Sequence, residues 1–189
     1  EKYPHLHITL GGPIFSVNSK QLMGHPEFFQ EFCDSIVTFE GEEPLHRLLT
    51  TLKNGSTLKS VPNLIFYEDE KIEFNEERVE LRFEEMPPPT FDGLPMDLYL
   101  SPYPILPVLQ SRGCYWGKCT FCTHSFIYGH RYGKQRTEQM VDELESLGKK
   151  YKTKYFTFSD EAVSPHSLND VSEEIIKRDV DIKSLALLK

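Results

Sequence analysis

Three cysteines in one short segment carry the clearest chemical signal in this sequence. Cys114, Cys119 and Cys122 are spaced C-x4-C-x2-C. Thiolates this close together usually hold a metal ion or an iron–sulfur cluster. A structural zinc site takes four protein ligands, and His124 could complete a Cys3His set. Three thiolates on a [4Fe–4S] cluster would instead leave one iron open for chemistry.

The composition limits the class of protein. The chain has 189 residues and 39% hydrophobic content, which suffices for one or two domains with a core. A net charge of −8 argues against a general nucleic-acid binder. We also expect no membrane partner, because no apolar run is long enough to span a bilayer. The clustered cysteines fit a reducing cytoplasm, and the fourth, Cys33, is predicted to be a small core residue.

The first half of the chain alternates strand and helix patterns. Residues 7–10 predict a buried strand that enters the turn Gly11-Gly12-Pro13, and residues 35–39 predict a second strand. A short helix is predicted at 26–32. A longer helix follows the turn at 40–43 and ends at Asn54-Gly55, with an apolar face of Leu45, Leu48, Leu49 and Leu52. This order predicts a parallel α/β layer.

A β-hairpin and a linker are expected next. Alternating residues around a polar centre predict the hairpin at 63–74, with a further strand at 79–83. Pro87-Pro88-Pro89 opens a proline-rich stretch that is typical of a semi-rigid linker.

The second half of the chain is predicted to continue as β, α, β, α, β. Residues 105–110 predict a strand that presents Cys114 at its carboxyl end, where (β/α) barrels build their sites. Thr137 is predicted to cap a helix that Gly148 closes, with Met140, Val141, Leu144 and Leu147 inward. A strand at 155–158, a helix at 168–178 with Leu168, Val171, Ile175 and Ile176 inward, and a strand at 185–188 complete the pattern. We expect a piece of a longer protein, because the chain ends directly after apolar residues.

The cysteine loop resembles that of radical S-adenosylmethionine (SAM) enzymes, and the chain around it resembles the subset with an N-terminal cobalamin-binding domain. In that family three cysteines ligate a [4Fe–4S] cluster, SAM chelates the fourth iron, and the reduced cluster cleaves SAM to a 5′-deoxyadenosyl radical. The family spacing is C-x3-C-x2-C with an aromatic residue before the last cysteine. Here Phe121 is that aromatic residue, and Gly117 is expected to absorb the extra residue of the first interval.

The resemblance also implies cofactor-binding residues. Gly11, Gly12 and the turn Glu40-Gly41-Glu42 match the family's cobalamin-binding turns, with Phe39 where the family often has glycine. The alternative for both is an ordinary βα turn.

For SAM, the resemblance implies Asp160 or Glu161 as partner of the ammonium group, and a helix cap or surface carboxylate is the alternative. Arg131 or Arg136 is implied as partner of a carboxylate of SAM or substrate, whereas Lys134 is expected in a solvated loop. The last candidates, Phe121 and Trp116, pack either on the cluster or adenine or in the core.

We therefore predict an α/β fold in three parts. Residues 1–86 are the C-terminal half of a Rossmann-like cobalamin-binding domain with a β-hairpin, residues 87–109 are a linker, and residues 110–189 are the first half of a partial (β/α)6 radical SAM barrel. The predicted protein is a cytoplasmic radical SAM enzyme with a [4Fe–4S] cluster, SAM and, as a further candidate, cobalamin, which performs B12-dependent methyl transfer or related radical chemistry.

Two alternatives to this function are open. One is a B12-independent radical SAM peptide maturase, and the other is a non-catalytic zinc-binding module. The radical SAM prediction includes an external electron donor of flavodoxin or ferredoxin type and a small-molecule or peptide substrate. No catalytic residue is predicted.

Overall fold

The computed structural model describes residues 5–76, 83, 86–128 and 131–186. The chain divides into two compact units, one formed by residues 1–81 with 121–129 and the other by residues 82–120 with 130–189. Of the strand predicted at 79–83 only Phe83 is described, and it is buried. None of the helices in the described part of the chain has the length and apolar composition that a membrane crossing requires.

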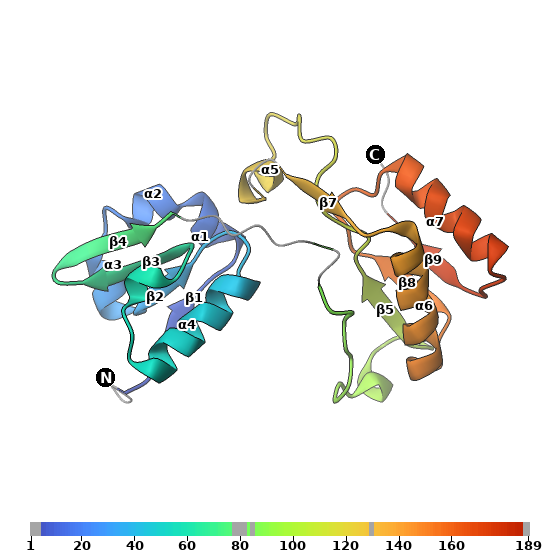
Figure 1. Ribbon diagram of the computed structural model, residues 1–189, viewed down its shortest axis with the longest axis horizontal. Helices are drawn as coiled ribbons and strands as arrows, with labels where there is room; N and C mark the ends of the chain where they lie inside the picture. The colour runs from blue at the N-terminus through green and yellow to red at the C-terminus, as the bar shows by residue number, and fades with distance from the viewer. Residues whose placement is uncertain (1–4, 77–82, 84–85, 129–130, 187–189) are drawn as a thin grey trace. The chain divides into compact units, whose positions relative to one another are not determined.

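The first unit is a four-stranded sheet with helices packed around it (Figure 1). Its elements in chain order are β1 (Thr9–Leu10), α1 (Pro13–Val17), α2 (Ser19–Leu22), α3 (Pro26–Glu31), β2 (Ser35–Val37), α4 (Glu42–Asn54), the 3-10 turn η1 (Leu58–Ser60), β3 (Leu64–Glu68), β4 (Lys71–Asn75) and α5 (His124–Ile127). The predicted helix at 26–32 and the hairpin at 63–74 are confirmed as α3 and β3–β4.

The sheet of the first unit is mixed: the predicted parallel layer is confirmed for β1 and β2, and the hairpin strands β3 and β4 extend it in antiparallel fashion. Its strand order is β1–β2–β3–β4, and β1 pairs with β2 in parallel while the other two pairs are antiparallel. Leu64 lies opposite Val37, so β3 starts at the carboxyl end of β2. The connection through α4 and residues 55–63 therefore starts and finishes at the same end of these strands, as an antiparallel pair requires.

Two predictions of burial in this unit are wrong. The strand predicted as buried at 7–10 is the short edge strand β1, whose residues are half-buried, and Ile8 beside it is 50% exposed. On α4, Leu48 is buried, but Leu45, Leu49 and Leu52 are exposed. The helix turns a different face inward, made by Pro44, Leu48 and Thr51. Its predicted end is confirmed, since Gly55 closes it at φ +61.

The second unit contains a parallel sheet and a separate antiparallel strand pair. Its elements are the 3-10 turn η3 (Met96–Leu98), β5 (Ile105–Val108), β6 (Ser111–Gly113), β7 (Tyr132–Lys134), α6 (Thr137–Tyr151), β8 (Tyr155–Phe158), α7 (Pro165–Lys177) and β9 (Lys183–Leu185). The parallel sheet has the order β5–β8–β9, as the β, α, β, α, β pattern predicts. β6 pairs antiparallel with β7.

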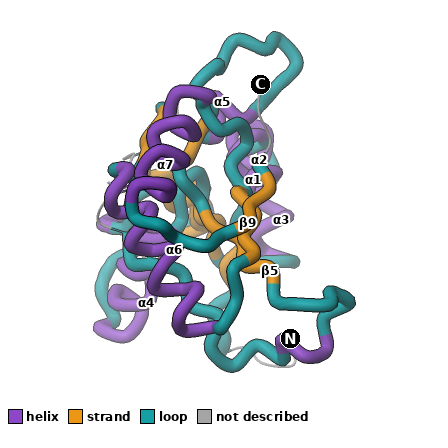
Figure 2. The backbone as a smooth tube through the Cα atoms, turned by 90° about the vertical axis from the view of Figure 1, so that its right-hand side faces the viewer, coloured by secondary structure: helices purple, strands orange, loops and turns teal. Residues whose placement is uncertain are grey.

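Helices α6 and α7 pack together over one face of the parallel sheet (Figure 2). The predicted inner face of α6 is confirmed, since Met140, Val141, Leu144 and Leu147 are all buried against the sheet side chains Leu106, Val108, Phe156 and Phe158. A mixed α/β fold with parallel strands is therefore what the structure shows.

Several details of this unit differ from the predictions. Arg136, not Thr137, occupies the N-cap position of α6, and the helix continues past Gly148 to Tyr151, with Lys152 as its C-cap residue at φ +52. Gly148 serves another purpose, since a Cβ there would stand 3.0 Å from the carbonyl oxygen of Thr153. Ile176, predicted to face inward, is 77% exposed, because the buried face of α7 is formed by Ser167 and Val171. The last strand starts earlier than predicted, at Lys183, and residues 187–189 lie outside the described residues.

Candidate functional site

The cysteine loop begins where β6 ends. Cys114 follows Gly113 directly, residues 114–123 have no helix or strand, and α5 starts at His124. Cys114, Cys119 and Cys122 form no disulfide, and all three are of intermediate exposure. Cys114 and Cys119 belong to the second unit and Cys122 to the first. Among the described residues, no three His, Cys, Asp or Glu side chains are grouped closely enough to hold a metal ion.

Two glycines shape the start of this loop. Gly113 has φ +87, and a Cβ there would stand 2.2 Å from the carbonyl oxygen of Arg131 on the neighbouring segment. Only glycine therefore allows β6 and β7 to pair in front of Cys114. Gly117 has φ +58, so it takes up the left-handed conformation expected of the residue that absorbs the longer first interval.

The chemistry of the donor set fits an iron–sulfur cluster. Thiolates are the usual ligands of such clusters, none of the three cysteines is held in a disulfide, and all three are partly exposed to an incoming metal. His124, the fourth member of the alternative zinc set, has its ring stacked on that of Tyr128 with centroids 6.5 Å apart.

A buried polar network lies beneath the start of the loop. Asp160 follows β8 and is 2% exposed. Its carboxylate accepts hydrogen bonds from the backbone N–H of Gln110 (3.2 Å), the backbone N–H of Ser111 (2.5 Å) and the Ser111 hydroxyl (2.5 Å). Burial raises the pKa of Asp160, and these hydrogen bonds partly offset that effect.

The network continues toward α6. The Gln135 side chain donates to the carboxylate of Glu143 at 3.1 Å and to the carbonyl of Leu109 at 3.3 Å. Burial raises the pKa of Glu143, and the bond from Gln135 lowers it in part. Gln110, Gln135 and Glu143 were not predicted from the sequence, because the pattern of residue types does not show where a polar side chain points.

The other residues predicted to contact SAM or the cluster are Glu161, Arg131, Arg136, Phe121 and Trp116. Glu161 is half-buried, while Arg131 and Arg136 are exposed. The basic segment around them is not simply a loop, since it contains β7. Phe121 is 88% exposed and Trp116 46%, which rules out core packing for Phe121. The ammonium of Lys118 lies 5.2 Å from the centre of the Trp116 ring.

The predicted cobalamin-binding turns both follow strands of the parallel pair β1–β2, as expected. Gly11 comes directly after β1, and residues 39–41 follow β2. A Cβ on Gly11 would stand 3.5 Å from the carbonyl oxygen of Val37, and one on Gly41 would stand 3.5 Å from a methyl group of the same valine. The two turns therefore meet around Val37, with Gly12 at φ +101 and exposed. Glu40 is half-buried, and Glu42 is the exposed first residue of α4.

Phe39 occupies a strained position in the second turn, and this too was not predicted. Its φ is +59, a conformation that favours glycine. Its backbone N–H donates to the hydroxyl of Ser16 at 2.7 Å, and its ring packs on that of Phe126 in α5 with centroids 5.9 Å apart. Within the first unit, this contact joins the turn after β2 to the helix that follows the cysteine loop.

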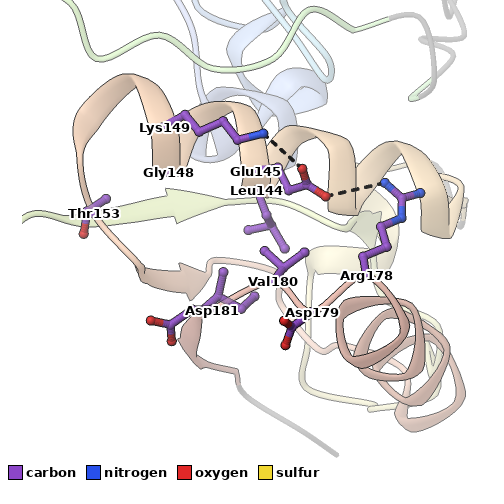
Figure 3. A pocket seen from close by; sticks show the side chains of 10 residues that line it. Leu144, Glu145, Gly148, Lys149, Thr153, Arg178, Asp179, Val180 and Asp181 are labelled. Carbon is purple, nitrogen blue, oxygen red and sulfur yellow. Dashed lines mark hydrogen bonds and ion pairs between the residues drawn. The ribbon is translucent and has the colours of Figure 1, made fainter.

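A cavity of about 320 Å³ lies at the opposite edge of the second unit (Figure 3). It is lined by residues that precede β8 and β9, including Thr153 and Asp181, whereas Asp160 follows β8. Its main charged side chains satisfy one another, since Glu145 pairs with Lys149 at 3.3 Å and with Arg178 at 3.8 Å.

Comparison with known proteins finds sequence similarity to a methyltransferase. No protein-family model matches the chain. It is 29% identical over 185 residues to an uncharacterized methyltransferase of Pyrococcus horikoshii, a match that covers 94% of this chain and 39% of that protein. The chain thus spans well under half the length of this relative.

Solved structures give the same result at the level of fold. The cobalamin-dependent SAM radical enzyme OxsB with bound aqua-cobalamin matches with a TM-score of 0.68 at 23% identity, covering 93% of this chain and 25% of OxsB. The radical SAM methyltransferase TsrM from Kitasatospora setae, with cobalamin and a [4Fe–4S] cluster bound, matches with a TM-score of 0.60 at 22% identity, covering 90% of this chain and 34% of TsrM. In fold, the chain therefore resembles these cobalamin-binding radical SAM enzymes, and in sequence it is similar to a methyltransferase.

Proposed function

We propose that this chain belongs to a radical SAM enzyme that holds a [4Fe–4S] cluster through Cys114, Cys119 and Cys122 and performs cobalamin-dependent methyl transfer. The observation that carries the proposal is the cysteine loop: three partly exposed cysteines, none of them in a disulfide, follow strand β6, whose first residue is bonded to Asp160 just after β8 of the parallel sheet. The sheet and its two helices would form the first part of a partial (β/α)6 barrel.

The chain's own residues have distinct tasks in this proposal. The three thiolates bind the cluster, which when bound supplies an electron to SAM at the iron that they leave open. Asp160 or Glu161 is the predicted partner of the SAM ammonium, and the exposed Arg131 and Arg136 are the predicted partners of a carboxylate.

The first unit supplies the proposed cobalamin edge. Gly11, Gly12 and Gly41 lack side chains where two turns meet around Val37, so the backbone there can approach a bulky ligand closely. Methyl transfer is the favoured reaction because cobalamin can carry a methyl group and because the Pyrococcus relative and TsrM are named as methyltransferases. The proposal includes an external electron donor of flavodoxin or ferredoxin type and a small-molecule or peptide substrate.

The cluster is tested by anaerobic reconstitution with iron and sulfide. We expect about four irons and four sulfides per chain. Alanine at any one of the three loop cysteines should abolish iron binding. Cys33→Ala is the matched control, because the Cys33 thiol is buried and burial raises its pKa to about 11, which disfavours the thiolate that a metal needs.

The outcomes separate the candidate functions. Stoichiometric zinc with no uptake of iron would overturn the proposal in favour of the zinc module. A full cluster in the complete protein without cobalamin would favour the B12-independent peptide maturase. The reaction itself is tested by reduction with dithionite, which should yield 5′-deoxyadenosine or a methyl group transferred from SAM.

A further inference from the structure

The carboxylate of Asp160 holds the first residues of the segment that leads to Cys114. Both of its oxygens are engaged: Oδ2 accepts from the backbone N–H of Gln110, and Oδ1 accepts from the backbone N–H and the hydroxyl of Ser111. All three residues are at most 2% exposed. Hydrogen bonds to an ionised acceptor are stronger than those between neutral groups.

Gln110 extends this connection to two further elements. Its carbonyl oxygen accepts from the backbone N–H of Gln135 at 2.8 Å, directly before α6. Its side-chain amide donates to the carbonyl of Ser167 in α7 at 3.1 Å. The residues just before β6 are therefore bonded to the end of β8, to the start of α6 and to α7.

The path from this anchor to the first cysteine is short and constrained. Only Arg112 and Gly113 separate Ser111 from Cys114. Both lie in β6, which pairs with β7, and Gly113 sits too close to the carbonyl of Arg131 for any side chain. Because Ser111 is fixed by Asp160 and Gly113 by β7, the backbone that delivers Cys114 has little freedom.

We propose that Asp160 is a positioning residue that fixes the base of the cysteine loop, and that it does not contact SAM. This inference rests on the proposed function and deepens it by deciding between the two carboxylates that follow β8. Asp160 is directed into the protein and closed off from solvent, whereas Glu161 is half-buried. Of the pair, Glu161 is therefore the residue that a ligand can reach.

The test uses the metal-free protein first. Backbone amide hydrogen exchange at Gln110 and Ser111 should accelerate roughly 10- to 100-fold in Asp160→Ala, because charge-assisted bonds that protect both amides are lost. Asp160→Asn and Ser111→Ala should show smaller effects, since each keeps part of the network. Asp181→Asn is the control, because that carboxylate is exposed and pairs with Lys154 at the other edge of the unit.

General destabilisation is distinguished within the same measurement. If Asp160→Ala only lowered global stability, the amides of Phe156 and Phe158 in β8 would accelerate by the same factor as those of Gln110 and Ser111. Equal acceleration, or none at Ser111, would overturn the inference. This readout needs no cluster, so it stands apart from any failure of the proposed function.

The second step measures the reconstituted protein. Asp160→Ala should bind less iron than the unaltered protein, and the fraction that is loaded should bind SAM with unchanged affinity. Full iron content combined with a roughly 10-fold or greater loss of SAM affinity would overturn the inference, because that result assigns Asp160 to the SAM ammonium. If the unaltered protein takes up no iron, the proposed function fails while the exchange result still decides the role of Asp160 in the loop.

Discussion

Replacing Gly113 with alanine is expected to break the pairing of β6 with β7 and to free the backbone in front of Cys114. The new Cβ would stand 2.2 Å from the carbonyl oxygen of Arg131, and Cβ contacts shorter than 3.0 Å essentially do not occur. The two strands must therefore separate by roughly 1 Å, which a packed structure resists. Gly93 provides a matched control, since it has a similar φ of +82 but nothing within 4 Å of an added Cβ.

The magnitude follows from two separate costs. A left-handed backbone conformation costs a non-glycine residue about 1–2 kcal/mol, and this applies to both variants. Overpacking adds about 1–3 kcal/mol, and this applies only to Gly113→Ala. We therefore expect losses in the free energy of unfolding of about 2–5 kcal/mol for Gly113→Ala and about 1–2 kcal/mol for Gly93→Ala.

Urea denaturation of both variants beside the unaltered protein measures these losses. The rate at which Cys114 reacts with a thiol reagent under native conditions gives a local reading, and Gly113→Ala should raise it while Gly93→Ala leaves it unchanged. Equal losses of stability in the two variants, or an unchanged thiol rate in Gly113→Ala, would refute the reasoning that the close approach to Arg131 constrains the loop.

Three further predictions concern burial, coupling and pH. Leu48→Ala should cost about 2–5 kcal/mol because Leu48 is buried, whereas Leu49→Ala should stay within roughly 0.5 kcal/mol because Leu49 is 59% exposed; similar losses by urea denaturation would contradict the fold of α4. A double-mutant cycle should give a coupling energy of about 0.5–1.5 kcal/mol between Phe39 and Phe126, and zero coupling would contradict the contact between their rings. Burial raises the pKa of Glu143 above its ordinary value of 4.5. The contribution of Glu143 to stability is therefore complete below pH 4.5 and is lost as the pH rises through the folded-state pKa. Glu143→Gln should flatten this part of the stability–pH curve, and an unchanged curve would contradict this prediction.

Local patterns were sufficient for most of the elements in the second unit. The spacing of Met140, Val141, Leu144 and Leu147 predicted the buried face of α6, and the apolar run at 155–158 predicted β8. Such signals depend only on neighbours within a few residues, because helix and strand periodicities are local properties of the chain. The spacing of the cysteines is equally local, and it alone pointed to the chemistry of the loop.

The direction of β3, the inward face of α4 and the role of Asp160 depended on the tertiary structure. Asp160 was predicted from the sequence to bind a ligand, yet its carboxylate accepts hydrogen bonds from Gln110 and Ser111, which lie about 50 positions earlier in the chain. The need for glycine at position 113 likewise comes from the carbonyl of Arg131 on another strand. The sequence by itself indicated most of the longer helices and strands and the cysteines predicted to bind a cluster, because these follow from residue type and short spacing. Only the fold decided which polar groups meet, because burial and hydrogen bonding are set by partners that are distant in the chain.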